Sequence, residues 1–155
     1  KPDLVIVDYT QLVTPSNTKE SRERQVAEIS RELQQMARDF DTTIIQLSQL
    51  AEKGSGNFRP TGESYTRESR AIYHDSHIVI YIHRVTEEKE LEKAYKSIPA
   101  FHERGSFEDI KATIETRANS GIRFVEINVD KNRDGEPGSN FYWFKGSDLD
   151  YYSII

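Results

Sequence analysis

Two polar residues follow apolar runs of the sequence at positions where they could act on a bound nucleotide. Asp8 comes directly after the aliphatic residues 4–7, and Gln49 comes shortly after the largely apolar residues 43–47. If both runs are neighbouring buried strands of a parallel sheet, Asp8 and Gln49 lie side by side at its carboxyl edge, where ligands bind. A carboxylate there can hold Mg²⁺ beside a nucleoside triphosphate, and a glutamine can orient a water or contact a phosphate. The alternative interpretations are an Asp that caps a strand and a Gln that closes a turn.

Basic residues of interest occur in two polar segments. Residues 51–70 form a long loop rich in Gly, Ser and Pro, and loops of this length inside a compact domain are usually functional or disordered. Its basic residues are Lys53, Arg59, Arg67 and Arg70, and its acidic ones are Glu52, Glu63 and Glu68. A phosphate-binding loop and a merely solvated loop explain this small excess of positive charge equally well. The second segment, residues 130–139, carries Lys131 and Arg133, which point the same way if the chain there is extended.

The apolar pattern predicts the strands that position these residues. Apolar residues spaced by three and four along residues 26–40 predict a helix, which connects the first two strands into a βαβ unit. Three further strands are predicted at residues 78–82, 122–129 and 140–145, and the last two form a β-hairpin. The sequence therefore predicts an α/β fold with a mostly parallel sheet flanked by helices and a C-terminal β-hairpin.

Other helices are predicted after the long loop. A short helix should run from about Glu68 to Asp75. Residues 87–96 have strong helix propensity but little apolar face, which predicts a surface helix. A further helix should start at Ser106, because Ser106 and Asp109 match a capping box. Its apolar face holds Phe107, Ile110 and Ile114.

The composition limits the class of protein. The chain has 155 residues, enough for one domain with a substantial core. Its net charge of −5 argues against a surface that is basic all over, although a local cationic loop is enough to meet phosphates. It has no cysteine, and no apolar run approaches the length needed to span a bilayer. These features predict a cytoplasmic protein with no role in a membrane.

Several known site patterns are incomplete in this sequence. Asp130, Asn132 and Asp134 match the first half of a calcium loop, but the residue at its twelfth position is Phe141 instead of Glu. Three histidines between residues 74 and 83 lack a fourth zinc ligand. No Gly-x-x-x-x-Gly-Lys-[Ser/Thr] loop occurs in residues 1–155. If Asp8 holds magnesium, we therefore expect the phosphate-binding loop to lie upstream of Lys1.

Four motifs in order give the chain a family resemblance along nearly all its length. They are residues 4–12, residues 44–50, the Arg67-Glu68-Ser69 motif with Ile72 and Asp75, and Lys131-Asn132-Arg133-Asp134-Gly135 followed by Gly138. Together they resemble the C-terminal RecA-like motor domain of DnaB-type replicative helicases. The resemblance implies a RecA-like core in an ATP-driven ring helicase, usually a homo-hexamer, that translocates on single-stranded DNA and unwinds duplex at a replication fork.

The resemblance also implies roles for individual residues. Asp8 matches the acid that coordinates Mg²⁺ beside ATP, and Gln49 matches the sensor of the γ-phosphate. Lys131 and Arg133 match a pair inserted into the neighbouring subunit's ATP site, with Arg133 as the arginine finger. The predicted DNA contacts lie in the long loop: Arg59, Arg67, Glu68 and Arg70. A primase and a helicase loader are further partners that the resemblance implies.

The sequence departs from the family in places. Arg70 stands where the family usually has Gly, and the excursion over residues 86–120 is longer than expected. The family's catalytic Glu and lysine-bearing phosphate loop are absent from residues 1–155, so we expect the chain to be the C-terminal half of a motor domain that does not hydrolyse ATP alone. A RecA-type recombinase, a clock-type ATPase and an assembly module without catalytic activity are the alternatives.

Overall fold

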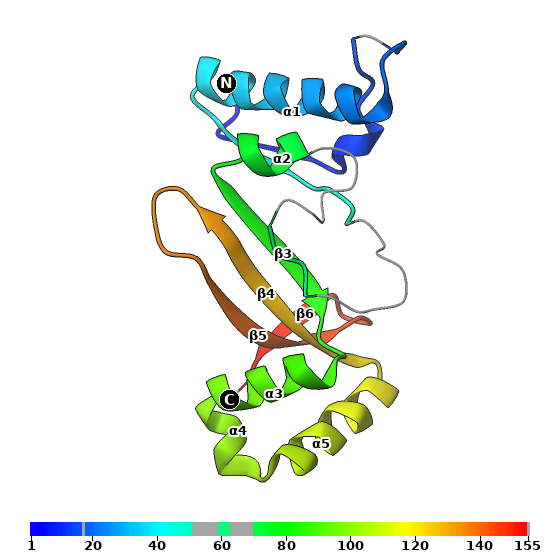
Figure 1. The fold of residues 1–155 in the computed structure, drawn as a ribbon, viewed down its shortest axis with the longest axis vertical. Coiled ribbons are helices and arrows are strands. Elements are labelled where there is room, and N and C mark those ends of the chain that lie inside the picture. Colours follow the sequence, from blue (N-terminus) through cyan, green and yellow to red (C-terminus); the bar gives the residue numbers. More distant parts are fainter. Residues whose placement is uncertain (17, 51–58, 63–69, 155) are drawn as a thin grey trace. The chain divides into compact units, whose positions relative to one another are not determined.

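The structure is a computed structural model that describes residues 1–16, 18–50, 59–62 and 70–154 (Figure 1). The chain divides into two compact units, and each is described by itself. The first unit comprises residues 1–52 with 61–79, and the second comprises residues 53–60 with 80–155.

The first unit contains the predicted βαβ arrangement. Its elements are β1 (Leu4–Val7), the 3-10 turn η1 (Thr10–Leu12), α1 (Arg22–Asp39), β2 (Thr43–Gln46) and α2 (Arg70–Asp75). β1 and β2 are parallel, with Leu4 paired to Thr43 and Val7 paired to Gln46. α1 buries Val26 and Ile29, the first two residues of the predicted apolar stripe. The strand–helix–strand prediction is therefore confirmed.

The two parallel strands are less buried than their sequence predicts. Leu4, Ile6 and Ile45 are exposed, whereas Val5 and Ile44 on the opposite face are half-buried. The expectation of strands buried on both faces is wrong for the described chain, because successive side chains of a strand point to opposite faces and only one face is packed.

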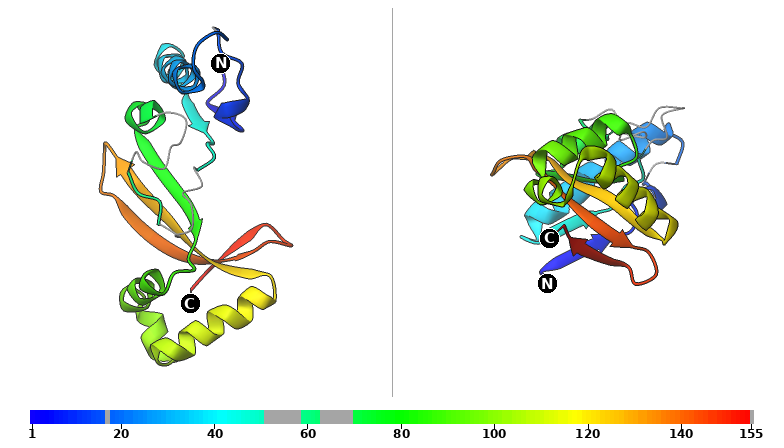
Figure 2. Two further views of the ribbon diagram at one scale, coloured as in Figure 1. Left: turned by 45° about the vertical axis from the view of Figure 1, so that its right-hand side comes forward. Right: turned by 90° about the horizontal axis from the view of Figure 1, so that it is seen from below.

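The second unit contains a four-stranded sheet with the order β3-β4-β5-β6. The strands are β3 (Ile78–Arg84), whose first two residues belong to the first unit, β4 (Ile122–Asn132), β5 (Gly138–Lys145) and β6 (Asp150–Ser153). β4 pairs antiparallel with β5, and β5 with β6 (Figure 2). The predicted hairpin is confirmed, but its strands are longer than predicted and its loop is reduced to residues 133–137. β6 was not predicted.

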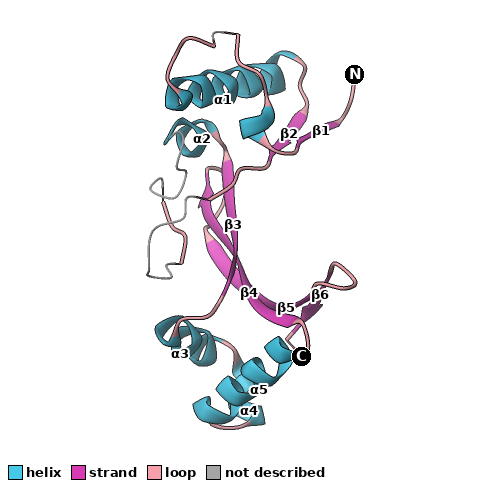
Figure 3. Cartoon of the chain, turned by 90° about the vertical axis from the view of Figure 1, so that its right-hand side faces the viewer, coloured by secondary structure: helices cyan, strands magenta, loops and turns pink. Residues whose placement is uncertain are grey.

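The excursion over residues 86–120 folds into three helices that lie together at one end of this sheet (Figure 3). They are α3 (Glu88–Ser97), α4 (Pro99–Arg104) and α5 (Phe107–Asn119). The capping box of Ser106 and Asp109 is present at the start of α5, as predicted. α3 differs from its prediction, because Leu91 and Ala94 are buried and make it part of the core. The apolar face of α3 is narrow, because one of its two buried residues is the small Ala94. The pattern of the sequence therefore suggested a surface helix.

These helices and the sheet share one hydrophobic core. Its buried members are Val85, Leu91, Ala94, Phe101, Ile110, Ile114, Phe124 and Trp143. The ring centroids of Phe101 and Phe124 lie 5.7 Å apart, and those of Phe124 and Trp143 lie 5.3 Å apart. The excursion is therefore an integral part of the second unit.

Replacing Phe101 by Ala should destabilise the protein strongly. Phe101 is 1% exposed, so the substitution leaves a cavity in the core and should lower the free energy of unfolding by about 3–5 kcal/mol. Phe40→Ala is the matched control, because Phe40 is 58% exposed and should cost no more than about 0.5 kcal/mol. Urea unfolding measures both values. Equal effects of the two substitutions would contradict this assignment of the core.

Candidate functional site

The carboxyl ends of β1 and β2 are tied together by backbone hydrogen bonds. The N–H of Leu47 donates to the carbonyl of Val7 at 2.9 Å, and the N–H of Thr10 donates to the carbonyl of Leu47 at 2.8 Å. The hydroxyl of Thr10, which is fully buried, also donates to the carbonyl of Leu47 at 2.9 Å. Asp8 and Gln49 therefore leave neighbouring strands at the same edge.

Both predicted side chains at this edge are accessible to a ligand. Asp8 and Gln49 are exposed in the described chain. Next to them, the side-chain amide of Gln11 donates to the hydroxyl of Ser48 at 2.9 Å and links the two segments once more. An exposed carboxylate oxygen is the kind of donor that Mg²⁺ prefers, so Asp8 is suited to hold this ion beside a nucleotide.

Lys131 and Arg133 lie at the end of β4 that leads into the hairpin loop. Lys131 is the second-last residue of β4 and is half-buried, whereas Arg133 is the first residue of the loop and is exposed. The side-chain carbonyl of Asn132 accepts a hydrogen bond from the N–H of Asp134 at 3.3 Å, which helps to turn the chain. This arrangement presents a guanidinium at the tip of a long hairpin.

The predicted DNA contacts are only partly within the described chain. Arg67 and Glu68 lie outside the described residues. Arg70 is the first residue of α2 and is exposed. Asp75, the acidic residue that matches the family motif, ends α2, and its carbonyl accepts a hydrogen bond from Gln34 at 2.6 Å.

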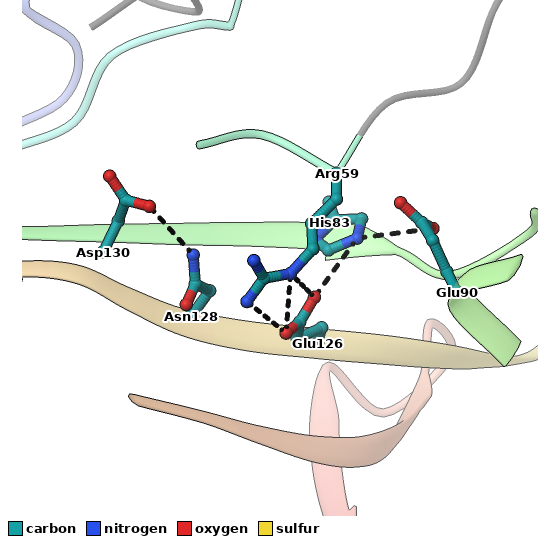
Figure 4. A network of polar contacts seen from close by, with 6 residues as sticks. All are labelled: Arg59, His83, Glu90, Glu126, Asn128 and Asp130. Carbon is teal, nitrogen blue, oxygen red and sulfur yellow. Dashed lines mark hydrogen bonds and ion pairs between the residues drawn. The ribbon is translucent and has the colours of Figure 1, made fainter. Parts of the chain in front are cut away.

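Arg59, the remaining predicted DNA contact, forms a buried ion pair with Glu126 of β4 (Figure 4). Its Nε lies 2.9 and 2.7 Å from the two carboxylate oxygens, and its Nη2 lies 2.7 Å from one of them. Glu126 is 2% exposed and the Arg59 side chain 25%. This pairing favours a structural role for Arg59 over the predicted DNA contact, because the guanidinium edge is committed to a carboxylate.

Two further side chains complete the cluster around this pair. Nε2 of His83 on β3 lies 3.5 Å from the Glu126 carboxylate and 3.7 Å from that of Glu90 on α3. The backbone N–H of Arg59 donates to the Glu90 carboxylate. Figure 4 shows His83 between the two carboxylates, with Arg59 beside it.

The electrostatics of the cluster follow from burial and this one cation. Burial lowers the pKa of His83, although the Glu126 carboxylate opposes the effect, so the imidazole is neutral near pH 7. Burial raises the pKa of Glu90. Burial would also raise the pKa of Glu126, but hydrogen bonds from Arg59 and Ser139 and the charge of Arg59 outweigh it and lower that pKa. Glu126 is therefore ionised and held by Arg59.

Sequence reasoning missed this cluster, although one signal was present. Phe124, Glu126 and Asn128 share one face of β4, and the structure buries all three. A Glu on the same strand face as a core Phe needs a cation in the fold.

Among the described residues, no group of three or more His, Asp or Glu side chains is arranged to hold a metal ion. No helix in the described ranges is long and apolar enough to cross a membrane.

The arrangement of strands, helices and hairpin is that of a RecA-like ATPase domain. The fold aligns with a DnaB-like replicative helicase whose interactions with primase were studied, with a TM-score of 0.68 and 27% identity, over 98% of this chain and 31% of that one. A second solved structure, of an ATPase domain, aligns with the same TM-score and identity over 44% of its chain. These likenesses define the class of protein.

The chain belongs to the DnaB-like helicase C-terminal domain family, whose pattern matches residues 1–151. It is 31% identical to the replicative DNA helicase DnaB of Helicobacter pylori, over 91% of this chain and 30% of that protein. It is 30% identical to the corresponding helicase of Mycoplasma genitalium, over 97% of this chain and 28% of that protein. The chain thus spans less than a third of these two relatives.

Removing the cation from the buried pair should be costly. Arg59→Ala leaves the Glu126 carboxylate buried without its partner, so the free energy of unfolding should fall by about 3–5 kcal/mol. Arg24→Ala is the control, because it removes an exposed pair with Glu20 and should change stability by less than about 1 kcal/mol. Urea unfolding measures both free energies of unfolding. An equally small decrease in the two variants would contradict the assignment of a buried ion pair.

The buried His83 should make stability depend on pH. Its folded-state pKa lies below its unfolded value, so the unfolded chain takes up more protons and stability is lost as pH falls through about 6.5. The lowered pKa of Glu126 acts at more acidic pH, and the raised pKa of Glu90 acts with the opposite sign. His83→Gln should therefore lose less stability than the wild type between about pH 7.5 and pH 5.5.

Urea unfolding at the two pH values measures this difference. His77→Gln is the matched control, because it makes the same substitution at an exposed histidine. An unchanged dependence in His83→Gln would show that His83 is protonated as readily in the folded chain as in the unfolded one.

Proposed function

We propose that this chain is part of an ATP-dependent, hexameric replicative helicase that translocates on single-stranded DNA and unwinds duplex. Membership of the DnaB-like family supports a helicase domain. The observation that carries the proposal is the parallel pairing of β1 with β2, which brings Asp8 and Gln49 to one edge. An acid and an amide at that edge suit a nucleotide with its metal ion.

In this proposal Asp8 holds Mg²⁺, which neutralises phosphate charge when it is bound with ATP. Gln49, on the adjacent strand, contacts the γ-phosphate and reports the state of the nucleotide. Arg67, Glu68 and Arg70 contact the DNA backbone. Arg59 is not among the proposed DNA contacts, because it is paired with Glu126.

Lys131 and Arg133 would act on the ATP site of a neighbouring copy. An exposed guanidinium at a hairpin tip can reach a second subunit, where it stabilises the charge that develops on the transferred phosphoryl group. This role requires an assembled ring, which is why we propose a homo-hexamer. Primase and a helicase loader are proposed as further partners, and the cytoplasm as the site of action.

We further propose that the chain is the C-terminal half of the motor domain and does not hydrolyse ATP alone. Residues 1–155 contain no Gly-x-x-x-x-Gly-Lys-[Ser/Thr] loop to bind the triphosphate. Residues 51–70 would face the DNA, and residues 86–120 would be an atypically long excursion between β3 and β4.

The test is the ATPase activity of a full-length protein that carries this chain, with and without single-stranded DNA, beside the chain alone. The full-length protein should be stimulated by DNA and the chain alone should be inactive. Arg133→Ala should reduce turnover by about 10³-fold or more, because it removes the finger, while ATP binding stays near the wild-type value.

Arg123→Ala is the matched control, since Arg123 is an exposed arginine near the start of β4, the strand that leads to Arg133, and lies far from the hairpin tip in sequence. Normal DNA-stimulated turnover in Arg133→Ala would remove the finger assignment. Turnover without any response to DNA would favour a clock-type ATPase, filament formation would favour a recombinase, and no turnover in any sample would favour an assembly module.

A further inference from the structure

We infer that Arg59 and Glu126 form a positioning pair that couples the DNA-facing loop to β4, the strand that leads to the arginine finger. This inference rests on the proposed helicase function. It assigns to the pair the task of making ATP turnover respond to DNA, in addition to holding the second unit together.

Arg59 is held in place through both its side chain and its backbone. Its side chain is fixed to Glu126 by contacts of 2.7 to 2.9 Å, and its backbone N–H is fixed to Glu90 of α3. The next residue, Pro60, is fully buried, and its ring restricts the backbone. Residues 59–60 are therefore held in place within the segment 51–70, whose proposed DNA contacts are Arg67, Glu68 and Arg70.

Glu126 lies on the strand that leads to the proposed arginine finger. Glu126 lies on β4, five residues before Lys131 and seven before Arg133. β4 lies between β3 and β5, and it is paired with β5 from Ile122 to Val129. A strand paired in this way transmits a displacement along its length. The length of strand between Glu126 and Lys131 is about 16 Å. A shift of Arg59 thus reaches the base of the hairpin.

An ion pair at this position is better suited to orienting side chains than to adding stability. A buried pair of charges is often no more stabilising than apolar side chains of the same size. A guanidinium that meets both oxygens of one carboxylate, however, fixes distance and direction together. His83 and Glu90 lie beside the pair, and among the described residues Arg59 is the permanent cation that contacts the Glu126 carboxylate. This geometry suits a pair that fixes the position of Arg59 relative to β4.

The test uses Glu126→Gln in the full-length helicase. The amide keeps the shape of the side chain but removes the charge that orients Arg59. Hexamer formation, ATP affinity and the ATPase rate without DNA should stay within about threefold of the wild type. The stimulation by single-stranded DNA should fall at least about fivefold, the lower end of typical coupling between two sites.

Three further variants distinguish a positioning role of the pair from a contribution to stability alone. Glu88→Gln is the matched control, because it removes the charge from an exposed pair with Lys111 and should keep full stimulation. Arg59→Lys keeps a charge but loses the guanidinium fork, so it should also reduce stimulation. The double variant Arg59→Lys with Glu126→Gln should be no worse than the more affected single variant, since both changes remove one interaction.

The outcomes are distinguishable. A wild-type protein that shows no response to DNA would remove the proposed function, and the inference with it. A stimulated wild type with an equally stimulated Glu126→Gln variant would overturn the inference alone. It would also be overturned if the rates with and without DNA fell by the same factor in both Glu126→Gln and Arg59→Lys, which is the result expected of a pair that only stabilises the fold.

Discussion

A carboxylate that is taken out of water needs a cation, and this requirement of Glu126 organises the polar interior of the second unit. The only way to meet it in the described structure is Arg59, which lies 67 residues earlier in the chain. The pair brings residues 59–60 onto β4 and places them against α3. It also explains why His83 can stay neutral beside the Glu126 carboxylate, because Arg59 already compensates that charge.

The first unit depends on a different constraint, the pairing of backbone groups at the ends of two strands. Beyond the last ladder pair, Leu47 exchanges hydrogen bonds with Val7 and Thr10, so the chain continues in register past both strand ends. Fully buried Thr10 secures this crossing with its hydroxyl. The position of Asp8 therefore follows from backbone geometry, and its carboxylate remains available at the surface for a ligand.

This difference explains what the sequence could predict. The βαβ unit, the hairpin and the capping box of Ser106 arise from patterns within short stretches, and the structure has all three. The ion pair of Arg59 depends on a partner far away in the sequence, and an arginine in a Gly-rich and Pro-rich segment resembles a solvated or DNA-binding residue. The burial of α3, the short helix α4 and the edge strand β6 were missed for a similar reason, because each is stabilised by tertiary contacts more than by its own pattern.

Residues 86–120 help to hold the cation at the hairpin tip in place. A guanidinium that acts on another subunit must be positioned by its own scaffold, since a mobile tip would lose the benefit of preorganisation. β4 begins on the aromatic core of Phe124, Phe101 and Trp143, to which α4 contributes Phe101, and Arg117 of α5 lies 4.4 Å above the Trp143 ring. Glu90 of α3 then holds the backbone of Arg59. The helices of residues 86–120 thus support β4 at its start and contact the ion pair at its middle, so they contribute to the rigidity that the hairpin tip requires.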